Sequence, residues 1–176
     1  MSMISWAMSA PTLLISYHEV KFLEAEALCR LGGRLGEAKT ALKDAVTAGF
    51  ENLGNSIIDA ADTWIYDGDS DLGADVAEAY FTDEVEPLFD ANPLQETMIQ
   101  KYLASFGASG ESLEAYNDYR RLKGAGENFI VLKNPQNSSK FPLRFGYGAD
   151  DVLANPEVKA AFGDGQYVYS CLLYTS

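Results

Sequence analysis

The stretch that decides the fold is Tyr17–Leu31, with the sequence YHEVKFLEAEALCRL. Ser16 followed by Glu19 fits a capping box, in which a hydroxyl and a carboxylate satisfy free N–H groups of the first helical turn. Gly32 and Gly33 then end the periodic run. These features predict a helix over residues 17–31. Its apolar residues recur every three or four positions, the spacing of one helical face, at Val20, Leu23, Ala27 and Leu31, with Leu28 beside them.

A second amphipathic stretch follows within a few residues. We expect it to begin near Leu35 and to end at Gly54. Two amphipathic helices joined by a short glycine-rich turn predict an antiparallel hairpin. The hairpin resembles one tetratricopeptide repeat, although only one clear copy is present and a solenoid needs about three. The apolar stripe of the second helix comprises Leu35, Ala38, Leu42, Ala45 and Gly49, widened by Val46, Phe50 and Leu53.

Helical periodicity continues along much of the chain. Asn92–Pro93 marks a helix start, since proline suits the first turn. The expected segments are a weaker one over 56–66 and stronger ones over Leu72–Phe89, Leu94–Phe106 and Leu113–Leu122. In the Leu94–Phe106 helix the expected buried face is Ile99, Tyr102, Leu103 and Phe106.

The composition changes between Gly124 and Tyr169, where Gly, Pro, Asn and aromatic residues dominate. Phe129–Leu132 is the strand-like run in this segment, and Asn155–Pro156 opens one more helical turn. The predicted fold class is therefore mostly α, with tetratricopeptide-like helical hairpins and an irregular, loop-rich C-terminal segment.

The charge of the chain excludes one class of partner. Its 176 residues include 13 Lys and Arg against 26 Asp and Glu, a formal net charge of −13. An acidic surface repels phosphate backbones, so we expect no nucleic-acid binding. No run of about 18 apolar residues is present, so we predict no membrane-spanning helix.

Neither end of the sequence looks like a native terminus. The first twelve residues lack the basic and long apolar regions of a signal peptide, and no lipid-attachment cysteine is present there. The last six, 171–176 (CLLYTS), look like translated sequencing-adapter sequence and are interpreted as a non-native tail. We therefore expect one domain over residues 13–170. Without Cys171, the remaining Cys29 supports neither a disulfide nor a metal pair.

No residues for catalysis stand out. His18 is the only histidine, which excludes a histidine-based triad and a multi-histidine metal site, and we interpret it as an exposed polar residue at a helix start. No glycine-rich phosphate loop, nucleophile elbow or HExxH pattern is present. We therefore predict no catalytic residues, no cofactor and no enzymatic activity.

One acidic run resembles a calcium loop. Asp67, Asp69 and Asp71 match the offsets of oxygen ligands in an EF-hand. The glycine that the loop needs comes one position late, at Gly73. We therefore interpret the run as an exposed loop that caps the following helix and expect no metal, with a calcium site on the three aspartates as the weaker alternative.

Aromatic residues supply the candidate ligand contacts. Trp64 and Tyr66 lie near an expected loop, where flat rings could stack on sugar faces. The more common role of such rings is to cover a helical core. Tyr116, Tyr119 and Arg120 are interpreted as structural, with a pairing of Arg120 or Arg121 to Asp118 or to a neighbouring helix.

Five segments, in order, resemble the SusD/RagB family. The resemblance covers most of residues 14–169, and it concerns the C-terminal portion of the family. Its segments are Leu14–Ala27 (LISYHEVKFLEAEA), Ala48–Gly54 (AGFENLG), Met98–Ala104 (MIQKYLA), Glu114–Arg121 (EAYNDYRR) and Phe141–Gly148 (FPLRFGYG) with Asn155–Pro156.

The resemblance implies a function and a location. Members of this family are lipid-anchored proteins of the outer-membrane surface in Bacteroidetes-type bacteria, where they cap a SusC-like TonB-dependent transporter. They capture oligosaccharides or peptides for import. The resemblance thus implies nutrient binding, most simply of oligosaccharides, with the signal peptide and the lipidated cysteine in a portion that this sequence does not include. Ligand-binding residues vary within the family and match no motif, so none is carried over.

Another class of function stays open. A soluble helical-repeat scaffold could bind a partner protein through its hairpin groove. Such a scaffold would have no affinity for glycans, whereas a nutrient-binding protein would. A glycan hydrolase is less well supported, because no poised acid–base pair can be identified.

Overall fold

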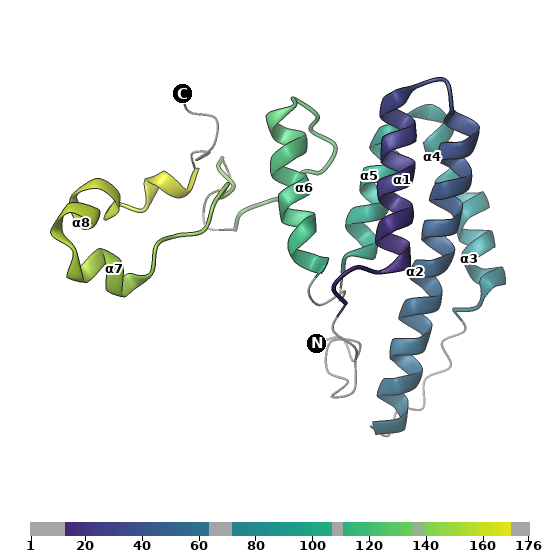
Figure 1. The fold of residues 1–176 in the computed structure, drawn as a ribbon, viewed down its shortest axis with the longest axis horizontal. Coiled ribbons are helices and arrows are strands. Elements are labelled where there is room, and N and C mark those ends of the chain that lie inside the picture. The colour runs from purple at the N-terminus through teal and green to yellow at the C-terminus, as the bar shows by residue number, and fades with distance from the viewer. Residues whose placement is uncertain (1–12, 64–71, 107–110, 136, 138, 170–176) are drawn as a thin grey trace. The chain divides into compact units, whose positions relative to one another are not determined.

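The computed structural model describes residues 13–63, 72–106, 111–135, 137 and 139–169. These residues form helices and no strand, so the predicted mostly-α class is confirmed (Figure 1). Their contacts divide the chain into two units, Met1–Ile130 and Val131–Ser176.

The first unit is built on a helical hairpin. Helix α1 (Tyr17–Leu31) and helix α2 (Leu35–Thr63) run antiparallel and pack on one another, and α2 extends beyond the start of α1 (Figure 1). Ser16 caps α1, since its Oγ accepts a hydrogen bond from the backbone N–H of Glu19 at 3.1 Å. Gly32 ends α1 with a φ of +70°, which glycine adopts without a steric penalty. The predicted boundaries of α1 and the predicted hairpin are thus confirmed.

The hairpin buries a continuous apolar core. Alanines line both sides of the α1–α2 contact and let the two backbones approach closely. Phenylalanines and a valine from the next helices close the core from the other side of α2. The core comprises Phe22, Ala25, Leu28, Ala38, Ala41, Leu42, Ala45, Val46, Phe81, Val85 and Phe89.

The face that α1 buries differs from the predicted one. Val20 and Leu23 are each 47% exposed and Leu31 is 73% exposed, while Ala27 is also exposed. Helix α1 carries apolar residues on two faces, and periodicity alone does not decide which one meets α2. Of the predicted apolar residues, Leu28 is buried, and the other residues that α1 buries are His18, Phe22, Ala25 and Glu26.

Helix α2 continues past its predicted end at Gly54. It runs on to Thr63, so the predicted break at Gly54 and the separate helix over 56–66 are wrong. Gly54 lies beside Leu72, which stands two positions before Ala74, the first residue of the next helix. A Cβ at Gly54 would lie 3.6 Å from the Cβ of Leu72. An isolated glycine inside a helix costs about 1 kcal/mol relative to alanine, which the packing of a long helix offsets.

A single helical run follows, interrupted by one wide turn. Helix α3 (Ala74–Tyr80) leads into a π-helical turn (Phe81–Val85) and then into helix α4 (Glu86–Ala91). Pro87 stands just after the wide turn. Proline lacks an N–H and its ring clashes with the carbonyl four residues earlier, so regular α-helix is disfavoured here. The turn relieves this conflict without ending the helix.

Helix α5 (Pro93–Ala104) packs against α1, α2 and α4. The Asn92 side chain caps it by accepting from the N–H of Gln95, as the Asn–Pro pair predicts. The predicted apolar face is wrong for Leu103, which is 52% exposed, and for Phe106, which lies beyond the helix and is 76% exposed, while Ile99 and Tyr102 are half-buried. The buried residues of α5 are Glu96, Thr97, Met98, Gln100 and Lys101.

Helix α6 (Ser112–Gly124) completes the first unit and buries Tyr119 and Leu122. In the second unit, helix α7 (Ala149–Ala154), helix α8 (Pro156–Phe162) and a 3₁₀ turn (Gln166–Tyr169) are separated by loops. The strand-like run Phe129–Leu132 forms no strand, since it pairs with no other strand among the described residues. No described residue of the second unit is buried.

Candidate functional site

The candidate residues predicted for ligand and metal lie outside the described part of the chain. This holds for Trp64, Tyr66, Asp67, Asp69 and Asp71. Within the described residues, no group of three or more His, Cys, Asp or Glu side chains is placed to hold a metal ion. The described chain offers two polar arrangements instead, a buried ionic network and an open aromatic hollow.

The ionic network centres on Glu26, a buried carboxylate of α1. Arg121 of α6 donates to both of its oxygens, at 2.6 and 2.9 Å, and Arg30 donates to one at 2.7 Å. Arg30 also holds Glu127 at 2.9 Å. Burial would raise the pKa of Glu26, but the hydrogen bonds from Arg121 and Arg30 outweigh burial and hold that pKa below its usual value.

A buried lysine extends the network to α5. Lys101 is 5% exposed, and its Nζ lies 2.7 Å from Asp118 and 3.0 Å from Glu19. Burial would lower the pKa of Lys101, yet the two carboxylates raise it above its ordinary value. Lys101 is therefore a permanent cation that joins α1, α5 and α6. Asp118 also pairs with Arg121, as predicted for an arginine of this segment.

The prediction for His18 is wrong. The side chain is buried, only 4% exposed, and its Nε2 lies 3.5 Å from the carboxylate of Glu111. The same carboxylate accepts a hydrogen bond from the backbone N–H of Ser16, so it takes the place that Glu19 would hold in a full capping box. Burial lowers the pKa of His18, against the opposing effect of Glu111 and Glu19.

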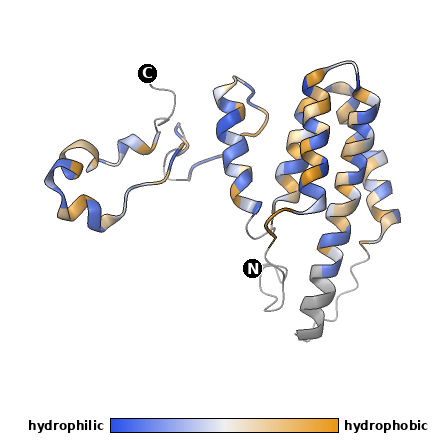
Figure 2. Ribbon diagram, in the orientation of Figure 1, coloured by the Kyte–Doolittle hydropathy of each residue, from blue (hydrophilic) through white to orange (hydrophobic). Residues whose placement is uncertain are grey.

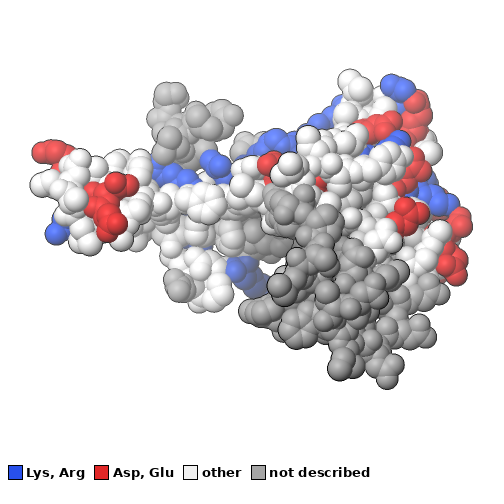
Figure 3. Space-filling model, turned by 60° about the horizontal axis from the view of Figure 1, so that its bottom comes forward, with Lys and Arg blue, Asp and Glu red and all other residues white. Residues whose placement is uncertain are grey.

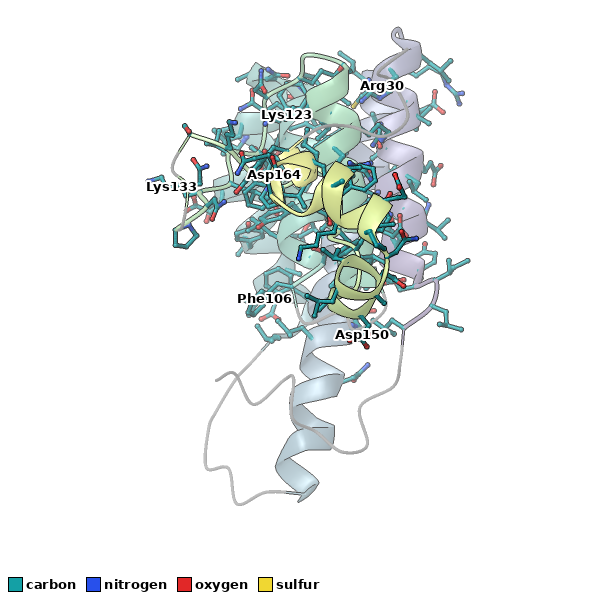
Figure 4. The ribbon with its side chains drawn as sticks, turned by 90° about the vertical axis from the view of Figure 1, so that its left-hand side faces the viewer. Arg30, Phe106, Lys123, Lys133, Asp150 and Asp164 are labelled. Carbon is teal, nitrogen blue, oxygen red and sulfur yellow. The ribbon has the colours of Figure 1, made fainter. Side chains whose placement is uncertain are left out.

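The network leaves no room for a nutrient. The cavity beside Glu19, Lys101 and Asp118 measures about 10 Å³, which suffices for about one water molecule. Its charged groups are paired with one another, and Arg30 and Lys123 lie at the same end of the first unit (Figure 4). The network therefore joins helices and is not a ligand site.

The second unit holds the larger hollow, with a volume of about 530 Å³. This volume lies in the range of small-molecule sites. The hollow is open and lies between the glycine-rich loop before α7 and the two short helices. Its lining combines two aromatic rings, one carboxylate, one amide and aliphatic surface: Tyr147, Phe162, Asp151, Asn155, Ala154, Pro156 and Val158.

A cluster of three rings supports the wall of this hollow. Tyr147 stacks on Tyr167 with ring centres 5.3 Å apart, and Phe162 lies 5.0 Å from Tyr147 and 5.1 Å from Tyr167. The guanidinium of Arg144 lies 4.7 Å from the centre of the Tyr167 ring, a distance at which a cation is attracted to the ring face. Tyr147 itself is 45% exposed.

Hydrogen bonds between side chains and the backbone hold the loop at Tyr147 and the start of α8, which line the hollow. The hydroxyl of Tyr167 accepts the backbone N–H of Tyr147 at 2.5 Å, and Arg144 donates to the carbonyl of Tyr167 at 2.9 Å. The Asn155 side chain caps α8 by accepting from the N–H groups of Glu157 and Val158. The predicted helical turn at Asn155–Pro156 is confirmed.

The surface charge of the two units is mixed. Lys and Arg side chains stand among Asp and Glu on the helical unit, and acidic side chains stand out on the unit of α7 and α8 (Figure 3). A flat ring beside a carboxylate suits a neutral ligand with one apolar face and several hydroxyl groups. An anionic ligand would meet Asp151 in the hollow and neighbouring acidic groups.

The sequence carries a local signal for this hollow in one of the segments already quoted. Residues Phe145–Gly148 (FGYG) alternate aromatic residues with glycines directly before α7. Glycines beside rings let a backbone pass close to them; a Cβ at Gly146 would lie 3.3 Å from the Tyr167 hydroxyl. The pattern does not predict the contact of Tyr147 with Phe162, because the two residues are separated by α7 and by the rest of α8.

These features define a mostly helical protein with a hairpin-based bundle and a separate aromatic surface hollow. The chain is similar to a SusD/RagB family protein from Bacteroides thetaiotaomicron whose crystal structure is known, with 55% sequence identity and a TM-score of 0.82. The match covers 97% of this chain and 36% of that chain. The chain belongs to the SusD/RagB family.

This chain thus spans little more than a third of the length of that solved relative. No protein-family model and no curated protein matches the chain. None of the described helices is long and apolar enough to cross a membrane.

Proposed function

We propose that this chain is the C-terminal portion of a nutrient-binding protein of the outer-membrane surface. The observation that carries the proposal is its 55% identity to a SusD/RagB family protein over 97% of its residues. The function implied by the family is capture of an oligosaccharide and its delivery to a SusC-like TonB-dependent transporter. Attachment would be by a lipid on the part of the protein that this sequence does not include.

The described residues support binding and offer little for catalysis. The buried charges are paired with one another, and the open hollow presents rings and one carboxylate. Glycosidases need two carboxyl groups facing one scissile bond, and Asp151 is the one carboxylate in the lining of this hollow. We therefore propose capture without chemical change of the ligand.

We propose the Tyr147 hollow as a sugar contact. A pyranose ring could stack on Tyr147 or Phe162 while its hydroxyl groups bond to Asp151. The test is calorimetric titration of the purified chain with short neutral oligosaccharides of α- and β-linkage. Tyr147→Ala should weaken the tightest of them about tenfold, the loss of roughly 1.4 kcal/mol of contact.

The matched control is Tyr17→Ala, which removes an exposed tyrosine from the other unit (63% exposed). It should leave affinity unchanged. If the oligosaccharides bind and Tyr147→Ala binds them equally well, the hollow is not the contact. Trp64 and Tyr66 then remain the candidates, and Trp64→Ala in the same titration tests them.

The proposed partner needs its own experiment. A tagged full-length protein that carries this portion should copurify from detergent-solubilised outer membranes with a TonB-dependent transporter. Copurification with a different class of protein, together with no affinity for any glycan, would favour the helical-repeat scaffold.

A further inference from the structure

Glu111 ends in a buried carboxylate whose two oxygens differ in their surroundings. The residue lies directly before α6 and is only 4% exposed. Its Oε1 accepts the backbone N–H of Ser16, whereas its Oε2 has no hydrogen-bond donor in the part of the chain that the structure describes. The Nε2 atom of His18 lies 3.5 Å from Oε2, which is longer than an ordinary N–H···O hydrogen bond. A buried acceptor is costly unless some group donates to it.

Lys101 of α5 has a donor to spare. An ammonium group carries three N–H donors. Among the described residues, its Nζ contacts two carboxylates, Asp118 at 2.7 Å and Glu19 at 3.0 Å. Lys101 is 5% exposed, so bulk water is not at hand for the remaining donor. The ammonium group therefore needs one more acceptor inside the protein.

A small cavity lies beside these two groups. Glu111 and Lys101 both line it, together with the carboxylates of Glu19 and Asp118 and the hydroxyl of Ser105. Its volume of about 10 Å³ corresponds to one water molecule. The cavity is therefore too small for a sugar but matches the two polar groups that lack a partner in number and in kind.

Helix α6 has reason to use a polar link at its start. Most of α6 is hydrophilic, whereas α1 and α5 carry more apolar residues (Figure 2). The contacts that hold α6 include the pair of Asp118 with Lys101 and the pair of Arg121 with Glu26. Both lie beyond the first turn of α6, so a link at Glu111 would fix the end of the helix that these pairs leave out.

We propose that one buried water molecule occupies this cavity and bridges Glu111 to Lys101. The water donates one hydrogen to Oε2 of Glu111 and accepts the remaining N–H of Lys101. Its second hydrogen goes to the carboxylate of Glu19 or Asp118, which gives it about three partners, the usual number for buried water. The start of α6 is then tied to α5 through the water and to the start of α1 through Ser16. The bridge is independent of the proposed sugar contact.

Water suits the site better than a metal ion. The oxygen of Glu111 needs a donor and the ammonium of Lys101 needs an acceptor, and a water molecule is both at once. A cation would meet the charge of Lys101 on the same wall. Among the described residues, acidic side chains are not grouped in threes that could hold a metal ion.

The first test counts long-lived water molecules in solution by oxygen-17 magnetic relaxation dispersion. Ala115 lines the cavity, and the larger side chain of Ala115→Val should fill it. We expect the parent chain to hold one long-lived water more than Ala115→Val. Equal numbers in the two proteins would overturn the proposal.

Thermal melting of the same variant gives a second readout. Filling an empty cavity stabilises a protein, whereas displacing a hydrogen-bonded water leaves Glu111 and Lys101 without that partner. Ala115→Val should lower the melting temperature by roughly 3 °C or more relative to its control. The control is Ala48→Val in α2, a half-buried alanine outside the cavity lining, which carries the same loss of helix propensity. A melting temperature at or above that of the control would speak for a dry cavity and against the bridge.

A high-resolution crystal structure of the chain shows the site directly and needs no variant. We expect one oxygen atom within about 3.2 Å of both Oε2 of Glu111 and Nζ of Lys101. A cavity without density would overturn the proposal. Density with several carboxylate contacts near 2.4 Å, about the length of calcium–oxygen bonds, would overturn it in favour of a metal ion.

Discussion

Glu26 is the buried carboxylate to which two arginines of the first unit donate hydrogen bonds. Its carboxylate lies on the buried side of α1 and accepts from Arg30 and Arg121. A buried charge is costly unless it is paired and hydrogen-bonded. Here the pairing is with guanidinium groups whose planar donors match a carboxylate. The loss of this one acidic group should therefore cost more than the loss of a surface charge.

Glu26→Gln tests the network at the scale of one residue. We expect it to lower the free energy of unfolding by about 1–3 kcal/mol, since an amide cannot accept both arginines equally and one donor loses its partner. Thermal melting followed by circular dichroism measures the loss. The control is Glu37→Gln, at the exposed Arg34–Glu37 pair, which should leave the melting temperature unchanged. If Glu26→Gln and Glu37→Gln lowered the melting temperature equally, the burial of Glu26 would not be what makes its ion pairs stabilising.

His18 predicts a particular dependence on pH. The folded state lowers its pKa, so the unfolded chain takes up a proton at a higher pH than the folded chain. The stability that this difference contributes is complete above the unfolded pKa of about 6.5 and is lost as the pH falls through the folded value.

His18→Gln should therefore reduce the fall in the free energy of unfolding as the pH drops below about 6.5. The measurement is a set of urea unfolding curves between pH 7 and pH 5 for the two proteins. Only the slopes are compared, because the substitution itself can change stability at every pH. An unchanged slope would show that the proton uptake lies elsewhere.

At this scale the sequence predicted some contacts and missed others for physical reasons. The arginine pairing in α6 was predicted, since Asp118 and Arg121 are three residues apart on one helix. The burial of His18 was not, because its partner Glu111 is distant in sequence. A lone polar residue on a helix does not reveal which face will be covered.

At the scale of elements, two glycines should respond in opposite ways to alanine. Gly54 lies inside α2, where an added Cβ meets Leu72 at an ordinary contact distance of 3.6 Å. Gly54→Ala should raise the free energy of unfolding by about 0.5–1 kcal/mol. Gly32 has a φ of +70° and a ψ of 165°, a region essentially restricted to glycine.

Gly32→Ala should therefore lower the free energy of unfolding by about 1–3 kcal/mol. Chemical denaturation of the two variants beside the parent chain measures both effects. If Gly54→Ala destabilises the chain, then Leu72 is packed more tightly against α2 than the distance indicates.

Helix boundaries followed from the sequence where a cap was present. Ser16 and Asn92 each cap a helix, and both starts were predicted from local chemistry. The helix end predicted at Gly54 was wrong, because a glycine can also lie inside a helix where another segment packs closely against it. The buried face of α1 was predicted wrongly because this helix carries apolar residues on two sides, and the neighbouring helix decides between them. The buried face of α5 was missed because it is mostly polar, with Lys101 paired to Glu19 and Asp118 of other helices.

At the scale of the whole molecule, the two units differ in how they are held. The helical unit has a continuous core, whereas the second unit has no buried residue among those described and depends on the Tyr147, Phe162 and Tyr167 rings. Regions with few buried contacts open at low free energy. The second unit should therefore open first.

Limited proteolysis measures this difference. A dilute nonspecific protease should cut first within residues 131–169 and leave a resistant fragment that contains α1 to α6. Mass spectrometry of the early products gives the sites. First cuts inside α1 or α5 would show that the ring cluster stabilises the second unit more than its exposure indicates.

The wide turn at Phe81–Val85 also has an evolutionary consequence. It accommodates one residue more than a regular helix would, directly before Pro87. If the proline is lost, the extra residue is no longer needed, and a deletion of one residue there restores the ordinary backbone ladder. Among homologous genes we therefore expect single-codon gaps in this stretch to occur together with replacement of the proline, while both flanking helices keep their lengths.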